Sequence, residues 1–433
     1  MMSRTQCVPR AVLMRIGDVA NAEAVRYGQP LGGVRVLAIE QMQALPYGTQ
    51  MLGRFGADVV KVEPLTGESG RGALPAMADP YGNPVGSTFL RNNLGKRSVA
   101  VDLKNPAGRD LVLRLAPRFD IVCENFKPGT VERLGLGYED IAAVHPSVIY
   151  VSVSGFGHGG GRYEGLPSYA PVAEAMGGLY DFKPDPDRPP ITSPVGALGD
   201  TGTSLFAVIG VLAALLHRAN TGEGQFVDIA MYDAMVALND AGIGYWSLGM
   251  ENAGNAPVVN QAFRASDGYF VLQVLRRPQF ERLADVIGRP EWKSDPSLAE
   301  PPQWLEQLER VLRPAIEEWA STMTKLDAAL VLGRAGIAAG PVHKQADVVA
   351  DPHLRERNMI IEMDRTDGVD QPVLSPGNPV KLSKVAEGPS SRTPWCGEHT
   401  EIVLVEELGM SRGEVAGLAA AGVVGLRGPS PSG

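Results

Sequence analysis

Cysteine is scarce in this sequence, and its scarcity excludes two kinds of protein. The 433 residues contain three cysteines, Cys7, Cys123 and Cys396, which are odd in number and far apart. None belongs to a C-x-x-C pair, and none has a histidine at the spacing of a metal site. A disulfide framework and a zinc site are therefore not expected, and we predict no bound metal and a reducing compartment.

Positive charge and long apolar runs are scarce as well. The formal net charge is −9, which argues against nucleic acid or an anionic membrane as the main partner. The N-terminal segment carries arginines but no uninterrupted apolar stretch, so a secretory signal is not expected. The longest apolar run, at 205–216, is too short to cross a bilayer. Together these absences favour a cytoplasmic enzyme or binding protein.

The chain is longer than one hydrophobic core usually supports, which predicts two domains. We expect a leader at 1–30, the N-terminal part of a large domain at 31–225, and a linker at 226–249. A small domain follows at 250–340. The remainder, 341–433, is expected to form a linker and a C-terminal part that rejoins the large domain.

Strands and helices alternate over the first 150 residues or so of the chain. Short β-rich runs occur at 34–39, 58–63, 98–102, 120–124 and 147–153, with helical patterns at 47–55 and 108–115. Strand, helix and strand within roughly 30 residues is the spacing of a βαβ unit. The alternation predicts an α/β fold with a Rossmann-like large domain on a parallel sheet, whose ligands lie at the carboxyl ends of the strands.

Helices are expected to dominate the middle of the chain. A helical hairpin is predicted from segments 203–218 and 231–248, with a short strand at 225–229 before the second helix. The small domain is expected to be α+β, with a strand at 266–274 and amphipathic helices at 279–287 and 304–332. A last helix is predicted at 399–408.

Asp200 stands in a glycine-flanked turn where the apolar run begins, between Gly199 and Gly202. A carboxylate at such a place has exposed geometry, mobile neighbours and a positive helix end nearby. This setting suits a nucleophilic or acid/base aspartate. It equally suits an ordinary helix cap, and the local sequence leaves both interpretations open.

Two further patterns bear on ligand binding. Segment 155–160 reads G-x-G-x-x-G after a strand, but no helix is expected after it to hold a pyrophosphate, so a dinucleotide site is not predicted. Basic residues also gather at the ends of the early strands, where they either bind phosphates or remain solvated. They are Lys61, Lys96, Arg97, Lys104, Lys127 and Arg133.

Several long blocks closely resemble the family III CoA-transferases. They are LGGVRVL at 31–37, GADVVKVEP at 56–64, NLGKRSVAVDLK at 93–104, ENFKPGTVERLG at 124–135 and TGEGQFVD at 221–228, followed by shorter matches at 339–342, 351–353 and 397–400. The resemblance covers about residues 31–410 in order. This family includes formyl-CoA transferase, carnitine CoA-transferase and α-methylacyl-CoA racemase.

The resemblance implies a CoA-transferase whose nucleophile is Asp200. The block at 196–200 matches the one that holds the catalytic aspartate of formyl-CoA transferase. Asp200 is then expected to attack an acyl-CoA thioester and to pass through an aspartyl-acyl anhydride and an aspartyl-CoA thioester before CoA reaches a carboxylic acid. Acyl-CoA and coenzyme A enter as substrates, and no permanently bound cofactor is implied.

The resemblance also implies binding residues and a homodimer of interlocked chains. Gln43 and Ala44 match a strand-end segment near the adenine and the catalytic cleft, and Tyr169 matches an active-site tyrosine. Four residues match CoA-contacting positions, with the two cations expected at phosphates: Lys104, Asn125, Phe126 and Arg133.

Two departures from the family pattern bear on the substrate. Ala170 stands where formyl-CoA transferase has a glutamate, and Tyr169-Ala170 replaces the His-Asp pair of the racemases. Segment 256–262 is bulkier and more apolar than the Gly-rich loop expected there. We therefore expect a larger or more hydrophobic acceptor. Two alternatives stay open: an α-methylacyl-CoA racemase or epimerase, and a CoA-ester-binding subunit of a heteromeric transferase.

Overall fold

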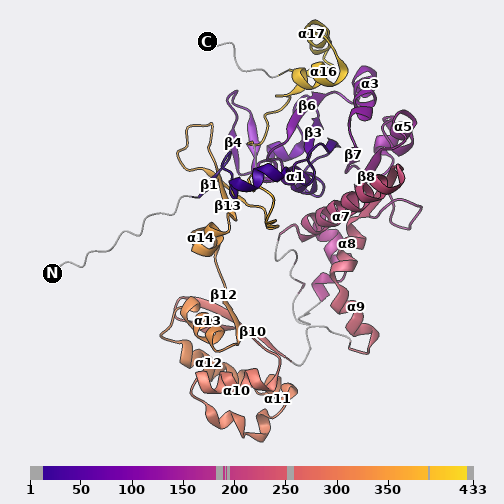
Figure 1. Cartoon of the computed structure of the whole chain (residues 1–433). Helices are drawn as coiled ribbons and strands as arrows, with labels where there is room; N and C mark the ends of the chain where they lie inside the picture. Colours follow the sequence, from indigo (N-terminus) through magenta and orange to yellow (C-terminus); the bar gives the residue numbers. More distant parts are fainter. Residues whose placement is uncertain are drawn as a thin grey trace, which may run out of the picture. The chain divides into compact units, whose positions relative to one another are not determined.

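The computed structural model describes residues 13–181, 189–190, 192, 196–250, 258–388 and 391–426 (Figure 1). The chain divides into two compact units. The large unit consists of 1–248 and 352–433, and the small unit consists of 249–351. Residues 256–257 of the segment expected to replace a Gly-rich loop lie outside the described residues.

The large unit is built on a seven-stranded sheet, as the alternation of strands and helices predicts. Its strand order is β15-β6-β3-β2-β7-β8-β9. The strands are β2 (Arg35–Ile39), β3 (Asp58–Glu63), β6 (Arg97–Val101), β7 (Ile121–Glu124), β8 (Ile149–Ser154), β9 (Gln225–Ala230) and β15 (Val424–Gly425). All neighbours pair in parallel except β15, which pairs antiparallel with β6. The predicted parallel α/β sheet is confirmed.

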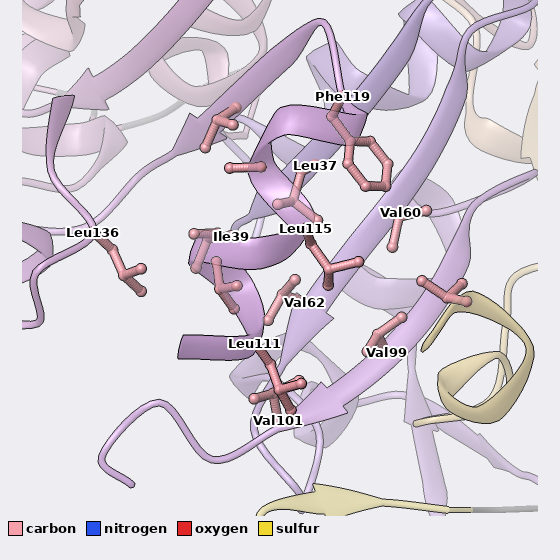
Figure 2. Close-up of a cluster of buried hydrophobic side chains, with 14 of the residues drawn as sticks. Leu37, Ile39, Val60, Val62, Val99, Val101, Leu111, Leu115, Phe119 and Leu136 are labelled. Carbon is pink, nitrogen blue, oxygen red and sulfur yellow. The ribbon is translucent and has the colours of Figure 1, made fainter. Parts of the chain in front are cut away.

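Alternate residues of the central strands face two separate cores, because side chains in a strand alternate between the faces of the sheet. Leu37 and Ile39 point to one face, whereas Val36 and Ala38 point to the other. Figure 2 shows the first core, where strand residues meet Leu111 and Leu115 of a helix. Since both faces are buried, the strands read as continuous apolar runs.

Helices cover both faces of this sheet. The first core receives α3 (Pro106–Leu115), α5 (Tyr138–Val144), α16 (Thr400–Leu408) and α17 (Arg412–Ala420). The second receives α1 (Pro46–Arg54), α6 (Ala170–Met176), α7 (Leu198–Thr221) and α8 (Met231–Leu238). Shorter elements of the large unit are β4 (Ala76–Ala78), β5 (Pro84–Gly86), α2 (Ser87–Asn92), α4 (Thr130–Arg133), α9 (Asp240–Ser247) and α15 (Pro352–Glu356).

Helix α7 is longer than the predicted segment 203–218, because two glycines that look like helix breakers are required by close packing. A Cβ atom at Gly199 would lie 2.8 Å from Ala170 Cα, and one at Gly202 would lie 2.8 Å from Leu238 Cδ1. By length and hydropathy, α7 is the one described helix that could cross a membrane. It packs against α1, α6 and α8, as the core helix of a folded unit does. The predicted second helix of the hairpin is divided at Asn239 into α8 and α9.

Segments that follow residue 13 pair with segments that follow residue 359 in the large unit. From the expected leader, β1 (Met14–Arg15) pairs in parallel with β13 (Ile360–Met363), which pairs antiparallel with β14 (Val373–Pro376). A short 3₁₀ helix, Ala22–Tyr27, follows β1 and buries Ala24. Gln29 Nε2 then donates to the carbonyl of Ala386 at 3.2 Å.

The small unit contains a three-stranded antiparallel sheet and a layer of helices. Its elements are β10 (Val259–Ala265), β11 (Gly268–Val274), α10 (Arg277–Val286), α11 (Pro301–Glu306), α12 (Arg313–Ala320), α13 (Lys325–Arg334), β12 (Ala338–Pro341) and α14 (Gln345–Ala350). Phe280 and Trp304 stack in its core with ring centroids 4.6 Å apart. Strand β10 was not predicted. It takes up residues 259–262 of the expected loop replacement, and Val259 is buried there.

Candidate active site

A cavity of about 260 Å³ lies at the carboxyl ends of β2, β7 and β8. The chain runs from β2 through β3 and β6 on one side of the sheet and from β7 through β8 and β9 on the other. Such a switch point is the usual ligand crevice of an open α/β sheet. The lining residues are Gln41, Met42, Ala44, Asn125, Phe126, Lys127, Pro128, Val153, Ser154, Gly155, Leu166, Pro167, Ser168, Tyr169, Asp200 and Met231.

Asp200 lies in the first turn of α7 and lines this cavity. The residue that caps the helix is Ala197, in a left-handed conformation with φ 56°, and no side chain bonds to the helix end from that position. The interpretation of Asp200 as the helix cap is therefore wrong. The N–H of Gly199 donates instead to the carboxylate of Glu174, a buried residue of α6, at 2.8 Å.

The Asp200 carboxylate is partly desolvated and has no bonded partner among the described residues. Burial raises the pKa of Asp200 to about 6, Arg91 opposes that rise, and the carboxylate of Glu174 adds to it. The group is mostly ionised at neutral pH. A carboxylate that is ionised, weakly solvated and open to a cavity is suited to nucleophilic attack.

The loop after β2 forms one wall of the cavity and is held at both sides. The N–H of Gln41 donates to Asn125 Oδ1 at 2.9 Å, and Asn125 Nδ2 donates back to the Gln41 carbonyl at 2.9 Å. Met42 has a φ of 60°, which is uncommon for a residue other than glycine. Its N–H donates to Glu68 at 3.0 Å. These bonds fix a strained loop at the cavity.

The loop, and helix α1 that follows it, each contact the helix that carries Asp200. The Ser204 hydroxyl, one turn after Asp200, donates to the carbonyl of Ala44. Helices α1 and α7 also approach closely, since a Cβ atom at Gly48 would lie 3.1 Å from the Ser204 carbonyl oxygen. Asp200 and the loop wall are consequently fixed relative to each other.

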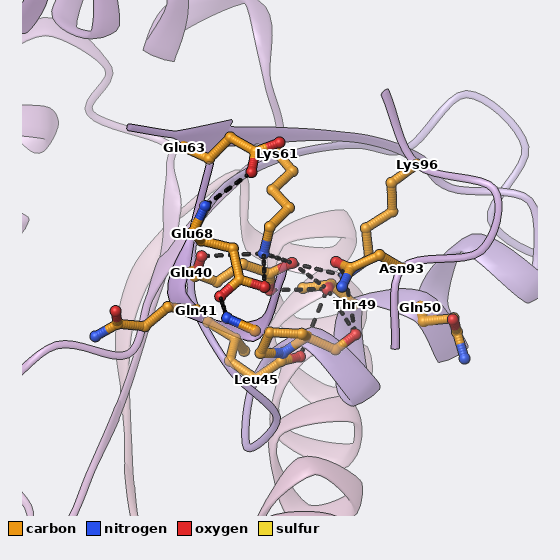
Figure 3. Close-up of polar contacts among 12 residues, drawn as sticks. Glu40, Gln41, Leu45, Thr49, Gln50, Lys61, Glu63, Glu68, Asn93 and Lys96 are labelled. Atoms are coloured by element: carbon orange, nitrogen blue, oxygen red, sulfur yellow. Dashed lines mark hydrogen bonds and ion pairs between the residues drawn. The ribbon is translucent and has the colours of Figure 1, made fainter. Parts of the chain in front are cut away.

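Behind the loop lies a buried ion network, defined as Glu40, Lys61, Glu63, Arg71 and Lys96 (Figure 3 labels Glu40, Lys61, Glu63 and Lys96). Lys96 Nζ lies 2.6 Å from Glu40 Oε1, and Arg71 Nη2 lies 2.7 Å from Glu63 Oε1. Burial by itself raises the pKa of Glu40, but Lys96 and Lys61 hold that pKa below its ordinary value. Burial lowers the pKa of Lys96 to about 8, although the negative charge of Glu40 raises it.

This network corrects part of the expectation for the basic residues. Lys61 and Lys96 are fully buried and bonded to Glu40, so they do not face a ligand. Arg97 is paired with Asp58 through a contact from Nη2 to Oδ2 of 2.5 Å. Lys127, in contrast, lines the cavity. Sequence reasoning could not separate these cases because pairing depends on strands that are distant in the chain.

The cavity brings together most of the predicted site residues. Ala44, Asn125, Phe126, Tyr169 and Asp200 all line it. Gln43 lies in the same loop as Ala44 but is buried and does not line the cavity.

Lys104 and Arg133 lie outside the cavity. Lys104 is exposed after β6, where its N–H donates to Asp102 at 2.9 Å. Arg133 is exposed at the end of α4, and its Nη2 donates to the hydroxyl of Thr130 at 3.3 Å. Neither side chain has a carboxylate partner in the described part of the chain.

The glycine-rich loop at 155–160 precedes no helix until α6 begins at Ala170, as predicted. Gly155 lines the cavity, and the His158 ring contacts the Ser152 hydroxyl at 2.8 Å. The helix that a dinucleotide pyrophosphate requires directly after this motif is therefore missing from these described residues.

Comparison with known proteins decides the family. The sequence profile of CoA-transferase family III matches residues 31–400. The chain belongs to CoA-transferase family III. It is 36% identical over 396 residues to a succinyl-CoA:mesaconate CoA-transferase of Haloarcula hispanica, covering 88% of this chain and 97% of the relative. It is 34% identical over 427 residues to a formyl-CoA:oxalate CoA-transferase of Bradyrhizobium diazoefficiens, covering 91% and 97%.

A solved structure supports the same assignment. A CAIB/BAIF family protein from Brucella suis superposes with a TM-score of 0.77 at 33% identity, covering 88% of this chain and 99% of that protein. The predicted resemblance is confirmed, and the chain is a CoA-transferase that moves CoA between an acyl-CoA and a carboxylic acid.

Within this family III CoA-transferase, Ala170 is the first residue of α6 and is buried. Its methyl group provides no acid or base next to Tyr169, which is strongly exposed at the cavity. Two functional residues that the sequence did not reveal are Glu174 on α6 and Arg91 on α2, whose charges shift the pKa of Asp200. Neither helix was predicted, so no sequence signal placed these two residues at the site.

Proposed function

We propose that this CoA-transferase works through covalent intermediates on Asp200. The observation that carries the proposal is the state of that carboxylate, which lines the switch-point cavity, has no bonded partner among the described residues and has a pKa raised to about 6. A structural carboxylate in the same unit, such as Glu40, is bonded to cations and has a lowered pKa. Asp200 therefore has the properties of a reactive group.

The reaction consists of four nucleophilic attacks. The Asp200 carboxylate attacks the donor thioester carbonyl, the C–S bond breaks, and an aspartyl-acyl anhydride and CoA thiolate form. The thiolate attacks the Asp200 carbonyl, which releases the donor acid and leaves an aspartyl-CoA thioester. The acceptor carboxylate attacks that carbonyl and expels the thiolate again. The thiolate finally attacks the acceptor carbonyl of the new anhydride, giving the product acyl-CoA and free Asp200.

Coenzyme A is proposed as a substrate that is only partly enclosed. A cavity of about 260 Å³ suits the thioester and acyl group, whereas the nucleotide end requires an outer surface. Ala44, Asn125, Phe126 and Tyr169 are assigned to the enclosed part. Gln43 supports the loop from beneath. Lys104 and Arg133, which are exposed cations, are assigned to phosphates at the outer edge.

The acceptor is proposed to be larger or more hydrophobic than formate or oxalate. Ala170 leaves no carboxylate beside Tyr169 to repel or orient a small anion. The two relatives act on succinyl-CoA with mesaconate and on formyl-CoA with oxalate, as their names state. A panel of acids tests the choice, and turnover restricted to formate and oxalate would overturn it.

A second copy of the chain is proposed as the partner, because α7 exposes an apolar stripe. Leu205, Ile209, Leu212 and Leu216 recur at helical spacing and are between 41% and 65% exposed in the single chain. A stripe of this kind is typical of a surface that a partner covers. An interlocked homodimer and a cytoplasmic location complete the proposal, and light scattering on the purified protein tests the dimer.

Trapping the covalent intermediate tests the mechanism. The purified protein is incubated with acyl-CoA and then treated with hydroxylamine or borohydride, and the modified peptide is mapped by mass spectrometry. We expect the adduct on Asp200, because both the anhydride and the thioester place an activated carbonyl there. An unmodified Asp200 under turnover contradicts the mechanism. Deuterium exchange at the α-carbon of the acyl group would instead favour the racemase alternative.

A further inference from the structure

Arg91 is a cation beside the active site that the reaction on Asp200 does not use. It lies on α2, Ser87–Asn92, and is exposed to solvent. Its backbone is anchored, since Gln50 Nε2 donates to the Arg91 carbonyl at 3.0 Å and the N–H of Leu94 donates to Gln50 Oε1 at 2.7 Å. Its Nη2 donates to Gln43 Oε1 at 2.5 Å. The guanidinium is thus oriented by the buried residue of the cavity-wall loop.

Most of the N–H donors of the Arg91 guanidinium have no hydrogen-bond acceptor among the described residues. An arginine carries five N–H donors. Within the described part of the chain, the Arg91 side chain uses one of them, in the hydrogen bond to Gln43. Arg71 and Arg97 differ, because each meets a carboxylate through two nitrogens. Nearby protein atoms nevertheless desolvate Arg91 enough to lower its pKa. A partly desolvated cation with no bonded carboxylate is a favourable place for an anion.

Arg91 and Asp200 belong to one site. Arg91 interacts electrostatically with Asp200: the charge of Arg91 lowers the pKa of Asp200, and the charge of Asp200 raises the pKa of Arg91. Gln43, the partner of Arg91, precedes Ala44, which lines the cavity and accepts the Ser204 hydroxyl from the Asp200 helix. Arg91 does not itself line the cavity, but its hydrogen bond to Gln43 holds the guanidinium at the loop that forms the cavity wall, on which the electrostatic attraction to Asp200 also bears.

We propose that Arg91 binds the second carboxylate of a dicarboxylic acceptor and so selects dicarboxylic over monocarboxylic acids. The proposal rests on the proposed function, since it takes Asp200 as the point where the first carboxylate reacts. The planar fork of a guanidinium matches a carboxylate through two parallel hydrogen bonds. Arg91 forms no covalent bond and transfers no proton in this role, so it is a specificity residue.

Steady-state kinetics of Arg91→Gln test the proposal with succinate and butyrate as acceptors of equal chain length. We expect KM for succinate to rise by about 10- to 100-fold, which corresponds to the loss of hydrogen bonds to a charged group. At pH 8, where Asp200 is ionised without the help of Arg91, KM for butyrate and KM for the acyl-CoA donor are expected to change less than about twofold, because neither involves the second carboxylate. Arg91→Lys should recover part of the loss, since it keeps the charge without the fork. Arg114→Gln, on the exposed side of α3, is the matched control.

Three results would overturn the proposal. An equal loss with succinate and butyrate would mean that Arg91 acts through Asp200. A rise in KM for the donor would place a phosphate of CoA at Arg91. Wild-type turnover with monocarboxylic acids alone would leave Arg91 without the proposed ligand.

Direct binding separates this proposal from the mechanism. Calorimetry of succinate with wild-type protein and with Arg91→Gln, without any acyl-CoA, is expected to show weaker binding by the variant. If Asp200 is never trapped but succinate binding still depends on Arg91, the mechanism fails and the specificity site stands. If Asp200 is trapped and succinate binds both proteins equally, the specificity site fails and the mechanism stands. Equal thermal unfolding of the two proteins verifies that the variant is folded.

Discussion

Two carboxylates of the large unit, Glu40 and Asp200, differ in their partners. Glu40 is paired with buried cations, whereas Asp200 has no bonded partner among the described residues. In the buried ion network, Lys96 and Lys61 hold the pKa of Glu40 below its ordinary value. At the cavity, Asp200 has no bonded partner among the described residues, and burial raises its pKa to about 6. Both carboxylates are desolvated, but only for Glu40 do neighbouring cations offset the cost of burying the charge. The difference separates a carboxylate that supports the fold from one that is kept reactive.

The largest effect is expected from removing the reactive carboxylate. Asp200→Asn should lower kcat by at least about 10³-fold, because an amide cannot form the anhydride. The free energy of unfolding should rise by about 1–3 kcal/mol at pH 8, since a carboxyl whose folded pKa is raised destabilises the fold whenever it is ionised. That penalty is present above the folded pKa of about 6 and disappears below the unfolded value. Kinetics and urea denaturation measure the two changes.

Asp110→Asn is the matched control for this substitution. Asp110 is an exposed aspartate of α3 that does not line the cavity. Its removal should leave both activity and stability unchanged. Residual activity of Asp200→Asn above about a tenth of wild type would remove the distinction between the two carboxylates.

The opposite signature is expected for the buried ion network. Glu40→Gln leaves Lys96 and Lys61 buried without their shared counter-charge, and should lower the free energy of unfolding by about 3–5 kcal/mol. Chemical denaturation at neutral pH measures the loss, with Glu139→Gln, an exposed residue of α5, as the control. A loss below about 1 kcal/mol would mean that the network does not compensate the burial of its charges.

A smaller effect is expected in the dependence of activity on pH. Asp200 must be ionised to attack, so kcat/KM should fall about tenfold per pH unit below pH 6 and level off above pH 7. Glu174→Gln removes a negative charge that raises the pKa of Asp200, while its amide oxygen can still accept from the N–H of Gly199. The midpoint of the profile should therefore move to lower pH. A midpoint that stays in place would show that Glu174 has no electrostatic effect on Asp200.

Long regular elements of the fold could be predicted from the sequence. The strands β2, β3, β6, β7, β8 and β9 of the large sheet were predicted as β-rich runs, and α3 was predicted from its helical period, whereas the short strands β4 and β5 were not predicted. Short elements were not: α6 spans Ala170–Met176 with a proline in its first turn, too few residues to show a period. Strand β10 was missed because its exposed positions, such as Asn260 and Arg264, are not separated from a loop by composition.

Within the candidate site as well, residues marked by a local sequence pattern could be predicted, and residues brought together only by the fold could not. Asp200 could be predicted because the family block containing it is local in sequence. Lys61 and Lys96 were expected either to bind phosphates or to remain solvated, and neither holds, since their partner Glu40 follows a different strand and only the folded sheet brings the three together. Arg91 acts on Asp200 from α2, more than a hundred residues earlier in the chain, and no local pattern marks such a relation.

The clamped loop after β2 has a consequence for how fast substrates are captured. Gln41 is held by Asn125 and Met42 by Glu68, so the backbone beside Asp200 already has one conformation before any ligand arrives. The conformational entropy of ordering this wall is lost when the chain folds, not when acyl-CoA binds. The thioester therefore binds to a wall that is already ordered, and the first attack does not have to wait for the loop to change its conformation.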